Sequence, residues 1–136
     1  MQLERVVTPA QIAAVAELAR EIWTEHYTPI IGPAQVAYML ARFQSAAAIA
    51  RQIAAEGHEY YLAPDAGYLA LVPDPAQARM LLSKIYVQAA RRGTGLGREL
   101  VEFAVRRCRQ AGCTELWLTV NRRNAGSIAF YERLGF

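Results

Sequence analysis

The chain has 136 residues, of which 54% are hydrophobic and 20% charged, with a formal net charge of +3. This length and composition predict one folded domain and exclude a disordered protein. No run approaches the roughly eighteen apolar residues of a membrane span, and "MQLERVVTPAQ" lacks the features of a secretory signal. Cys108 and Cys113 fit neither a zinc site nor a disulfide framework, so we expect reduced thiols in a cytoplasmic protein.

The first half of the sequence predicts a short strand followed by two helices. The expected ranges are 2–7 for the strand, 8 to about 26 for the first helix and 34–56 for the second. Thr8 followed by Pro9 is typical of a helix start, and Thr28-Pro29 and Gly32-Pro33 are expected to break that helix. The second helix should end at Gly57, and its polar pair Gln44-Ser45 is a candidate break within it.

The second half predicts four strands and two helices around a glycine-rich segment. The expected strands span 59–63, 68–72, 79–87 and 115–120; one helix follows the glycines and stops at 111–112, and a short one spans about 125–134. Turns at 64–67 and 72–75 join the first three of these strands as hairpins. The order β-α-α-β-β-β-α-β-α predicts an α/β fold with a mixed, mostly antiparallel central sheet flanked by helices. The glycines then lie at the carboxyl end of a central strand, where open sheets bind ligands.

The segment "ARRGTGLGREL" places Gly93, Gly95 and Gly97 behind two arginines and in front of a helical pattern. The spacing matches neither a dinucleotide fingerprint nor a Walker A loop. Glycines at a helix start still allow a phosphate to approach the free N–H groups of the first turn, and arginines add charge-assisted hydrogen bonds. By itself, the segment is equally compatible with a tight turn that binds nothing.

Two longer segments resemble a known family. "KIYVQAARRGTGLGRELVEFA" resembles motif A of the GNAT superfamily of N-acetyltransferases, with the signature spanning Arg92 to Gly97. "LWLTVNRRNAGSIAFYERLGF" resembles motif B, whose positions are read here as Asn124, Ser127, Phe130, Tyr131, Gly135 and Phe136. The two motifs occur in the right order on the expected elements, and the order of elements is also similar to that of the family.

The resemblance implies acetyl-CoA as the acyl donor and a set of residues that bind it. The backbone N–H groups of Gly93, Thr94, Gly95, Leu96 and Gly97 would surround the pyrophosphate. Arg92 and Arg98 would add positive charge, and Arg91 could reach the 3′-phosphate. Ile85, Tyr86 and Val87 would pair with the pantetheine arm, which enters a gap between strands 79–87 and 115–120. Asn124, Ser127 and Tyr131 complete the donor-binding set.

The implied reaction is N-acetylation of a primary amine, in a small molecule or peptide, by direct attack in a ternary complex. Val87 would donate its N–H to the thioester carbonyl. Tyr131 would be the general acid, since a phenol with its ordinary pKa of about 10 could protonate a forming thiolate. No carboxylate lies on strand 79–87, so the base is unassigned; the candidates by residue type are Glu21, Glu25, His26 and Glu59.

The acceptor is left open by the sequence. The segment 21–40 should line its site, where Glu21 and Glu25 could receive a cationic amine such as a polyamine. Lys84, the only lysine, would disfavour a cation if it faces the cleft. Peptide N-termini, amino acids and aminoglycosides all stay candidates.

Residues 1–136 are expected to form a single GNAT-type domain that is incomplete at its C-terminus, because family members continue for two more strands. The resulting open sheet edge would favour a homodimer. A non-catalytic acyl-CoA-binding or regulatory module is the alternative function. A nucleic-acid-binding domain ranks far behind, and neither nucleic acid, a membrane nor a metal is expected as a partner.

Overall fold

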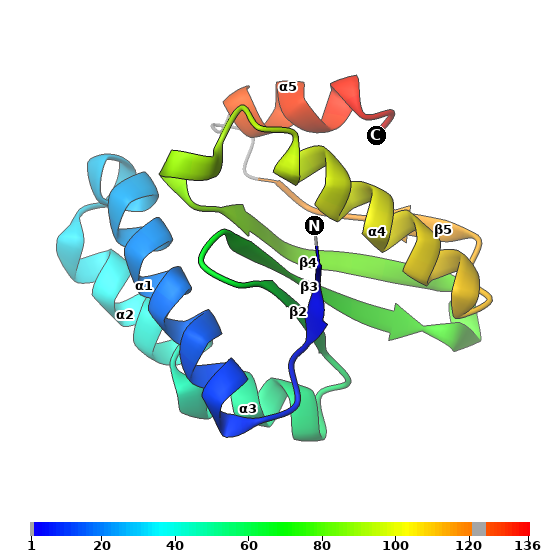
Figure 1. Ribbon diagram of the computed structural model, residues 1–136, viewed down its shortest axis with the longest axis horizontal. Coiled ribbons are helices and arrows are strands. Elements are labelled where there is room, and N and C mark those ends of the chain that lie inside the picture. The colour runs from blue at the N-terminus through cyan, green and yellow to red at the C-terminus, as the bar shows by residue number, and fades with distance from the viewer. Residues whose placement is uncertain (1, 121–124) are drawn as a thin grey trace.

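The protein is described by a computed structural model that covers residues 2–120 and 125–136 (Figure 1). Helices α1 (Pro9–Ile31), α2 (Pro33–Phe43) and α3 (Ala46–Ala55) cover one face of a five-stranded sheet. Helix α4 (Leu96–Gln110) covers the other face, and α5 (Ala125–Arg133) lies beside the N-terminal end of α4. In the described part of the chain, no helix is long and apolar enough to cross a membrane.

The sheet is mixed and mostly antiparallel, as predicted. Its spatial order is that of the chain: β1 (Glu4–Arg5), β2 (Glu59–Ala63), β3 (Gly67–Asp74), β4 (Arg79–Val87) and β5 (Glu115–Trp117). The first three pairings are antiparallel, and only β4 and β5 run parallel. Tyr60, Leu62 and Tyr68 are buried beneath α1–α3, whereas Tyr61, Leu69 and Leu71 are buried beneath α4.

Strand β4 changes its pairing halfway along its length. Leu82 pairs with Leu71 of β3 and Lys84 pairs with Ala70, which leaves Ser83 as the extra residue of a β-bulge. On its other side, β4 pairs with β5 only over Arg79–Leu81. The second half of β4 therefore has no described strand on that side, and the two strands separate as the family resemblance implied.

Helix α1 is longer than predicted: the expected break at Thr28-Pro29 is wrong, whereas the expected break at Gly32-Pro33 is confirmed. Pro29 lies in the last turn, where one lost backbone hydrogen bond does not stop the helix. The helix ends at Gly32, whose φ is +85° and whose N–H donates to the Thr28 carbonyl at 2.9 Å. The additional turn places Ile30 and Ile31 on the wall of the cavity described below.

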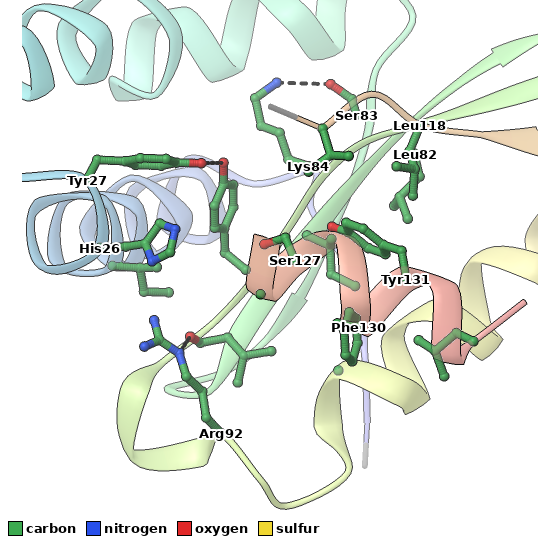
Figure 2. A pocket seen from close by; sticks show the side chains of 18 of the residues that line it. His26, Tyr27, Leu82, Ser83, Lys84, Arg92, Leu118, Ser127, Phe130 and Tyr131 are labelled. Carbon is green, nitrogen blue, oxygen red and sulfur yellow. Dashed lines mark hydrogen bonds between the residues drawn. The ribbon is translucent and has the colours of Figure 1, made fainter. Parts of the chain in front are cut away.

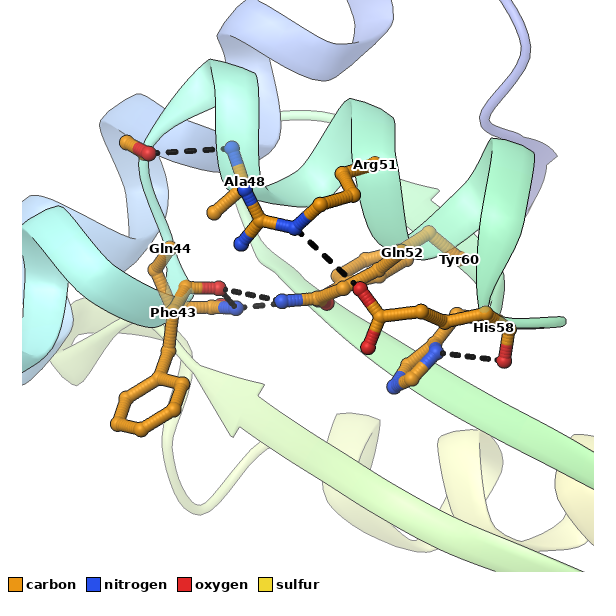
Figure 3. Close-up of polar contacts among 9 residues, drawn as sticks. Phe43, Gln44, Ala48, Arg51, Gln52, His58 and Tyr60 are labelled. Carbon is orange, nitrogen blue, oxygen red and sulfur yellow. Dashed lines mark hydrogen bonds and ion pairs between the residues drawn. The ribbon is translucent and has the colours of Figure 1, made fainter.

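The predicted break at Gln44-Ser45 is confirmed, and it is held by buried amides (Figure 3). The Gln44 side chain accepts a hydrogen bond from the Tyr68 hydroxyl at 2.7 Å and donates to the Tyr60 oxygen at 3.0 Å. Gln52 donates to the Phe43 carbonyl at 2.8 Å, which satisfies the end of α2. Polar groups buried in this way require such partners, so the network defines how α2 and α3 meet the sheet.

Three strands have bounds that differ from those predicted. The expected strand 2–7 shortens to Glu4–Arg5, because the Gln11 side chain accepts the N–H groups of Val7 and Thr8 in the capping box of α1. The expected strand 115–120 ends at Trp117. By contrast, β3 continues to Asp74, because Pro73 lies beyond the last residue paired with β2 and needs no ladder donor on that side.

A buried ion pair attaches α4 to the sheet. The carboxylate of Glu59, whose side chain is 9% exposed, accepts two hydrogen bonds from Arg107 at 2.9 Å and one from Tyr61 at 2.8 Å. Burial acts to raise the pKa of Glu59, but the bonds from Arg107 and Tyr61 outweigh it and the net pKa is lowered. Glu59, a candidate base in the sequence, is thus a structural residue.

We expect Arg107→Met to lower the free energy of unfolding by about 3 kcal/mol, because the buried carboxylate of Glu59 loses its hydrogen-bonded cation and keeps only Arg5, at 3.8 Å. Arg106→Met is the matched control, since Arg106 is an exposed neighbour on the same helix and should change little. The loss is expected above the ordinary pKa of Glu59, 4.5, and should fade as the pH falls through its lowered folded-state value. Urea titrations at pH 7 and pH 3 measure the loss of unfolding free energy and its dependence on pH. An equal loss in Arg107→Met and Arg106→Met at pH 7 would contradict the prediction.

Candidate functional site

A cavity of about 1030 Å³ lies where β4 and β5 separate. Its walls come from the C-terminal half of α1, part of α2, the second half of β4, the turn before α4, residues 118–120 and the inner face of α5 (Figure 2). A volume of this order holds a large ligand. The cavity is located at the carboxyl end of a central strand, as the glycine segment predicted.

The turn between β4 and α4 presents open backbone to this cavity. Gly93 and Gly95 have φ values of +78° and +86°, which L side chains rarely adopt, and nothing lies within 4 Å of a Cβ at either position. Gly95 is the N-cap of α4, and among the described residues no side chain caps this helix. The N–H groups of its first turn can therefore bind an anion.

Gly97 serves a different purpose from the other two glycines. It lies inside the first turn of α4, and a Cβ there would come within 3.0 Å of the Phe130 ring. Its missing side chain lets α5 pack against the start of α4, and this contact closes one wall of the cavity (Figure 2).

The cavity is strongly basic. Its described lining residues include no Asp or Glu, but they do include the basic side chains Lys84, Arg91, Arg92, Arg98 and Arg133. Arg92 is oriented by its neighbours: its Nε donates to the Val87 carbonyl at 3.3 Å, and its Nη1 lies 3.8 Å from the Glu25 carboxylate. Such a cavity favours an anionic ligand.

Backbone groups of β4 face the gap between the strands. The Gln88 N–H donates to the Ala66 carbonyl at 2.7 Å, on the side of β3. Successive residues of a strand point their backbone groups to alternate sides, so those of Val87 and Ile85 point away from β3. The second half of β4 therefore offers an extended ligand the hydrogen-bonding groups of a strand edge.

Helix α5 contributes Tyr131 and Ser127 to the cavity (Figure 2). Tyr131 packs edge-on against Phe130 and Phe136, with ring centroids 5.4 and 5.8 Å away. Burial, with a smaller contribution from Tyr27, raises its pKa to about 12. The sequence-based expectation of an ordinary phenol pKa near 10 is thus corrected, and the hydroxyl stays protonated throughout the physiological range.

Helix α1 contributes an aromatic cluster on the opposite wall. The Tyr27 and Tyr86 hydroxyls are 3.1 Å apart, and the Trp23 ring packs 5.4 Å from that of Tyr86. His26 lies on the same helix and lines the cavity. Burial and the charge of Arg92 lower the pKa of His26, so its imidazole is neutral at pH 7 and retains a lone pair.

Most of the residues that the sequence singled out meet at this cavity. Its lining includes Ile85, Tyr86, Val87, Arg91, Arg92, Gly93, Gly95, Gly97, Arg98, Ser127 and Tyr131. Thr94 and Leu96 lie instead on a smaller depression outside it, and the Leu96 side chain packs into the core beneath α4. Asn124 lies outside the described residues.

Among the four candidate bases, His26 is the one that lines the cavity. Glu21 and Glu25 are not part of its lining; they accept from Gln88 at 3.2 Å and pair with Arg92, respectively. The expectation that they receive a cationic amine is therefore not supported by their positions.

The segment 21–40, which the sequence assigned to the acceptor site, lines the cavity through residues that include Ile22, Ile30, Ile31 and Met39. Lys84, which the sequence raised as a residue that could face the cleft, also lies on the wall. Sequence reasoning missed the bulge at Ser83, which brings that hydroxyl onto the wall. The bulge itself has no local sequence signal, since it arises from pairing with β3.

Comparison with known proteins gives a consistent result. The model of the acetyltransferase (GNAT) family matches residues 13–136. Streptothricin acetyltransferase of Streptomyces lavendulae is 37% identical over 71 residues, which are 52% of this chain and 38% of that protein. The [ribosomal protein bS18]-alanine N-acetyltransferase of Escherichia coli K12 is 48% identical over 42 residues, or 31% of this chain and 28% of that protein. This chain therefore matches well under half the length of either relative.

A solved structure shares the whole fold. The PaiA N-acetyltransferase from Thermoplasma acidophilum, crystallised in complex with coenzyme A, superposes with a TM-score of 0.81 at 20% identity. The superposition covers 100% of this chain and 90% of that one. The arrangement of sheet and helices is therefore that of an N-acetyltransferase.

The two histidines of the chain allow the positions of two cations of the cavity, Arg92 and Lys84, to be tested separately. Arg92 lowers the pKa of His26, whereas Lys84 lowers that of His58. We expect Arg92→Gln to move the titration of His26 to higher pH and leave His58 unchanged, and Lys84→Gln to do the reverse. Proton NMR titration of the two imidazole signals measures this; a variant that shifts both signals equally would contradict the placement of these two cations.

Proposed function

The chain belongs to the GNAT family of acetyltransferases, and we propose that it transfers the acetyl group of acetyl-CoA to a primary amine of a small molecule or peptide by direct attack in a ternary complex. The observation that carries this proposal is the glycine turn, whose open N–H groups face a basic cavity beside an edge of β4 with which no described strand pairs. Two relatives are named for acetylating streptothricin and an alanine of ribosomal protein bS18, which supports an amine acceptor.

The chain has the groups that a coenzyme A pyrophosphate requires. Backbone amides from Gly93 to Gly97 would bind its oxygens, and Thr94 and Leu96 would contribute through their backbone alone. Arg92 and Arg98 supply charge beside the turn, and Arg91, which also lines the cavity, would bind the 3′-phosphate. Asn124 stays a prediction.

The strand edge would orient the rest of the donor. Ile85 and Val87 direct backbone groups into the gap between β4 and β5, so they can pair with the pantetheine arm and donate to the thioester carbonyl. When bound, acetyl-CoA supplies the acetyl group and a thiolate leaving group. The rigid walls of β4 and α5 would hold the thioester in line with an incoming amine.

Tyr131 would act on the departing sulfur. A phenol whose pKa is about 12 is fully protonated at neutral pH. Since thiols have a pKa of about 8.5, complete transfer of the phenol proton to a thiolate is unfavourable. We therefore assign Tyr131 the role of donating a hydrogen bond to the sulfur as negative charge develops there.

His26 would accept the proton that the attacking amine loses. Its lowered pKa leaves a neutral imidazole at the cavity wall, which can accept the proton of the attacking amine directly or through water. A single domain, a homodimer, a cytoplasmic location and the absence of a nucleic-acid partner stay predictions.

Gly95→Asp should abolish binding of acetyl-CoA, because it adds a side chain and a negative charge at the pyrophosphate site. Gly57→Asp is the matched control: Gly57 also has positive φ, at +70°, and open space where a Cβ would lie, but it follows the C-cap of α3 and is not part of the cavity lining. Calorimetric titration of acetyl-CoA into both variants measures the difference. Similar affinities in the two variants would show that the turn does not hold the donor.

Tyr131→Phe should reduce turnover by roughly ten- to a hundredfold, as expected for one hydrogen bond to a charged group. Its affinity for acetyl-CoA should change little, because the hydroxyl acts on charge that develops only during transfer. Thiol release measures turnover and calorimetry measures affinity. Unchanged turnover in the variant would remove Tyr131 from the reaction.

The pH dependence of the wild-type rate gives a second test of Tyr131. Because its pKa is about 12, the wild-type rate should show no alkaline loss from this phenol below about pH 11.

A further inference from the structure

The positive charges of the cavity form two groups. Arg91, Arg92 and Arg98 belong to the glycine turn or the start of α4, where the phosphates of the donor are expected. Lys84 lies apart from them, at the opposite end of the cavity in Figure 2, with Tyr131 and Ser127 in between. The donor phosphates therefore leave the Lys84 ammonium without a counter-ion.

The protein does not supply that counter-ion from its described residues either. The Lys84 ammonium donates to the Ser83 hydroxyl at 3.2 Å and lies 5.9 Å from the centre of the Tyr60 ring. Glu56 acts on it only at longer range, and its carboxylate is paired with Arg51 at 3.4 Å (Figure 3). Burial lowers the pKa of Lys84, so an anion bound beside it would restore the stability of the charged form.

The α1 and α2 walls of the cavity are mainly apolar. They carry Ile22, Tyr27, Ile30, Ile31 and Met39 together with His26 and Gln35, and no described lining residue is acidic. A polyamine or an aminoglycoside would bring further positive charge next to Lys84 and find no carboxylate to receive it. A ligand with one negative charge and an apolar body matches these walls in charge and in polarity.

These observations concern the acceptor, so they rest on the acetyl transfer proposed above. We propose that the acceptor is an amine that carries a carboxylate, as a free amino acid does, and that Lys84 and Ser83 bind this carboxylate. The apolar wall from α1 and α2 takes the side chain of the acceptor, and its amine is directed toward the gap between β4 and β5.

The test uses matched pairs of acceptors that differ only in the carboxylate: L-phenylalanine with phenethylamine, and L-leucine with isoamylamine. Thiol release from acetyl-CoA gives kcat/KM for each. We expect the amino acids to be preferred by roughly ten- to a hundredfold, the range for hydrogen bonds to a charged group. Equal use of both members, or a preference for the decarboxylated amine or for spermidine, would overturn the inference.

Three variants identify the residue responsible. Lys84→Gln should bring the ratio within each pair close to one by raising KM for the amino acid. Lys84→Arg should keep the preference, since it retains the cation. Arg42→Gln, which removes an exposed charge of α2 outside the cavity lining, should leave the ratio unchanged. If Lys84→Arg lowers kcat equally for both members, then Lys84 is a proton acceptor and the inference is wrong.

A binding experiment separates this inference from the proposed reaction. Calorimetric titration of 3-phenylpropionate and of 3-phenylpropanol into the chain saturated with coenzyme A requires no turnover. Binding of the carboxylate alone, lost in Lys84→Gln, would support the subsite even if no amine is acetylated, and then the proposed reaction would be the part that fails. Turnover of amines without any difference between the two probes would leave the reaction standing and overturn the subsite. Absence of both turnover and carboxylate binding would overturn both.

Discussion

Backbone hydrogen bonding along β4 is the constraint on which the site depends. A strand inside a sheet normally uses its N–H and C=O groups on both sides. Among the residues that the structure describes, β4 is paired on both sides only near its start, because its pairing with β5 ends at Leu81 and Trp117. The remaining groups on that side face a cavity. The bulge at Ser83 occurs just beyond the point where β4 stops pairing with β5 but continues to pair with β3. An extended ligand can then occupy the place of a neighbouring strand.

The surrounding elements keep that gap open without exposing the core. Helices α1–α3 bury one face of the sheet and α4 buries the other, so the strands can separate at one end while packing remains continuous elsewhere. The buried pair of Glu59 with Arg107 and the amide network of Gln44 and Gln52 hold helices to opposite faces of the sheet. Gly97 admits the Phe130 ring and thereby lets α5 form the last wall. Each of these contacts lies away from the proposed chemistry but sets the position of a wall.

The distribution of charge divides the cavity into two ends that suit different ligands. The arginines beside the glycine turn suit a polyphosphate, whereas one lysine beside an apolar wall suits a single carboxylate. Between them, burial raises the pKa of Tyr131 and lowers that of His26, so one side chain remains a donor and the other an acceptor at neutral pH. Charge, polarity and protonation thus support the same assignment of donor end, reaction centre and acceptor end.

The sequence alone determined the order of the elements, the mixed sheet, the glycine turn with its arginines, and the family resemblance, because these depend on local periodicity, on turn residues and on short motifs. It also located the break at Gln44-Ser45, which is a local polar interruption. Only the tertiary structure decided that α1 continues through Pro29, that β5 stops at Trp117 and that Glu59 is paired rather than catalytic. It also placed Lys84 on the wall of the cavity and raised the pKa of Tyr131, because burial, strand pairing and the neighbours of a side chain come from residues far apart in the chain.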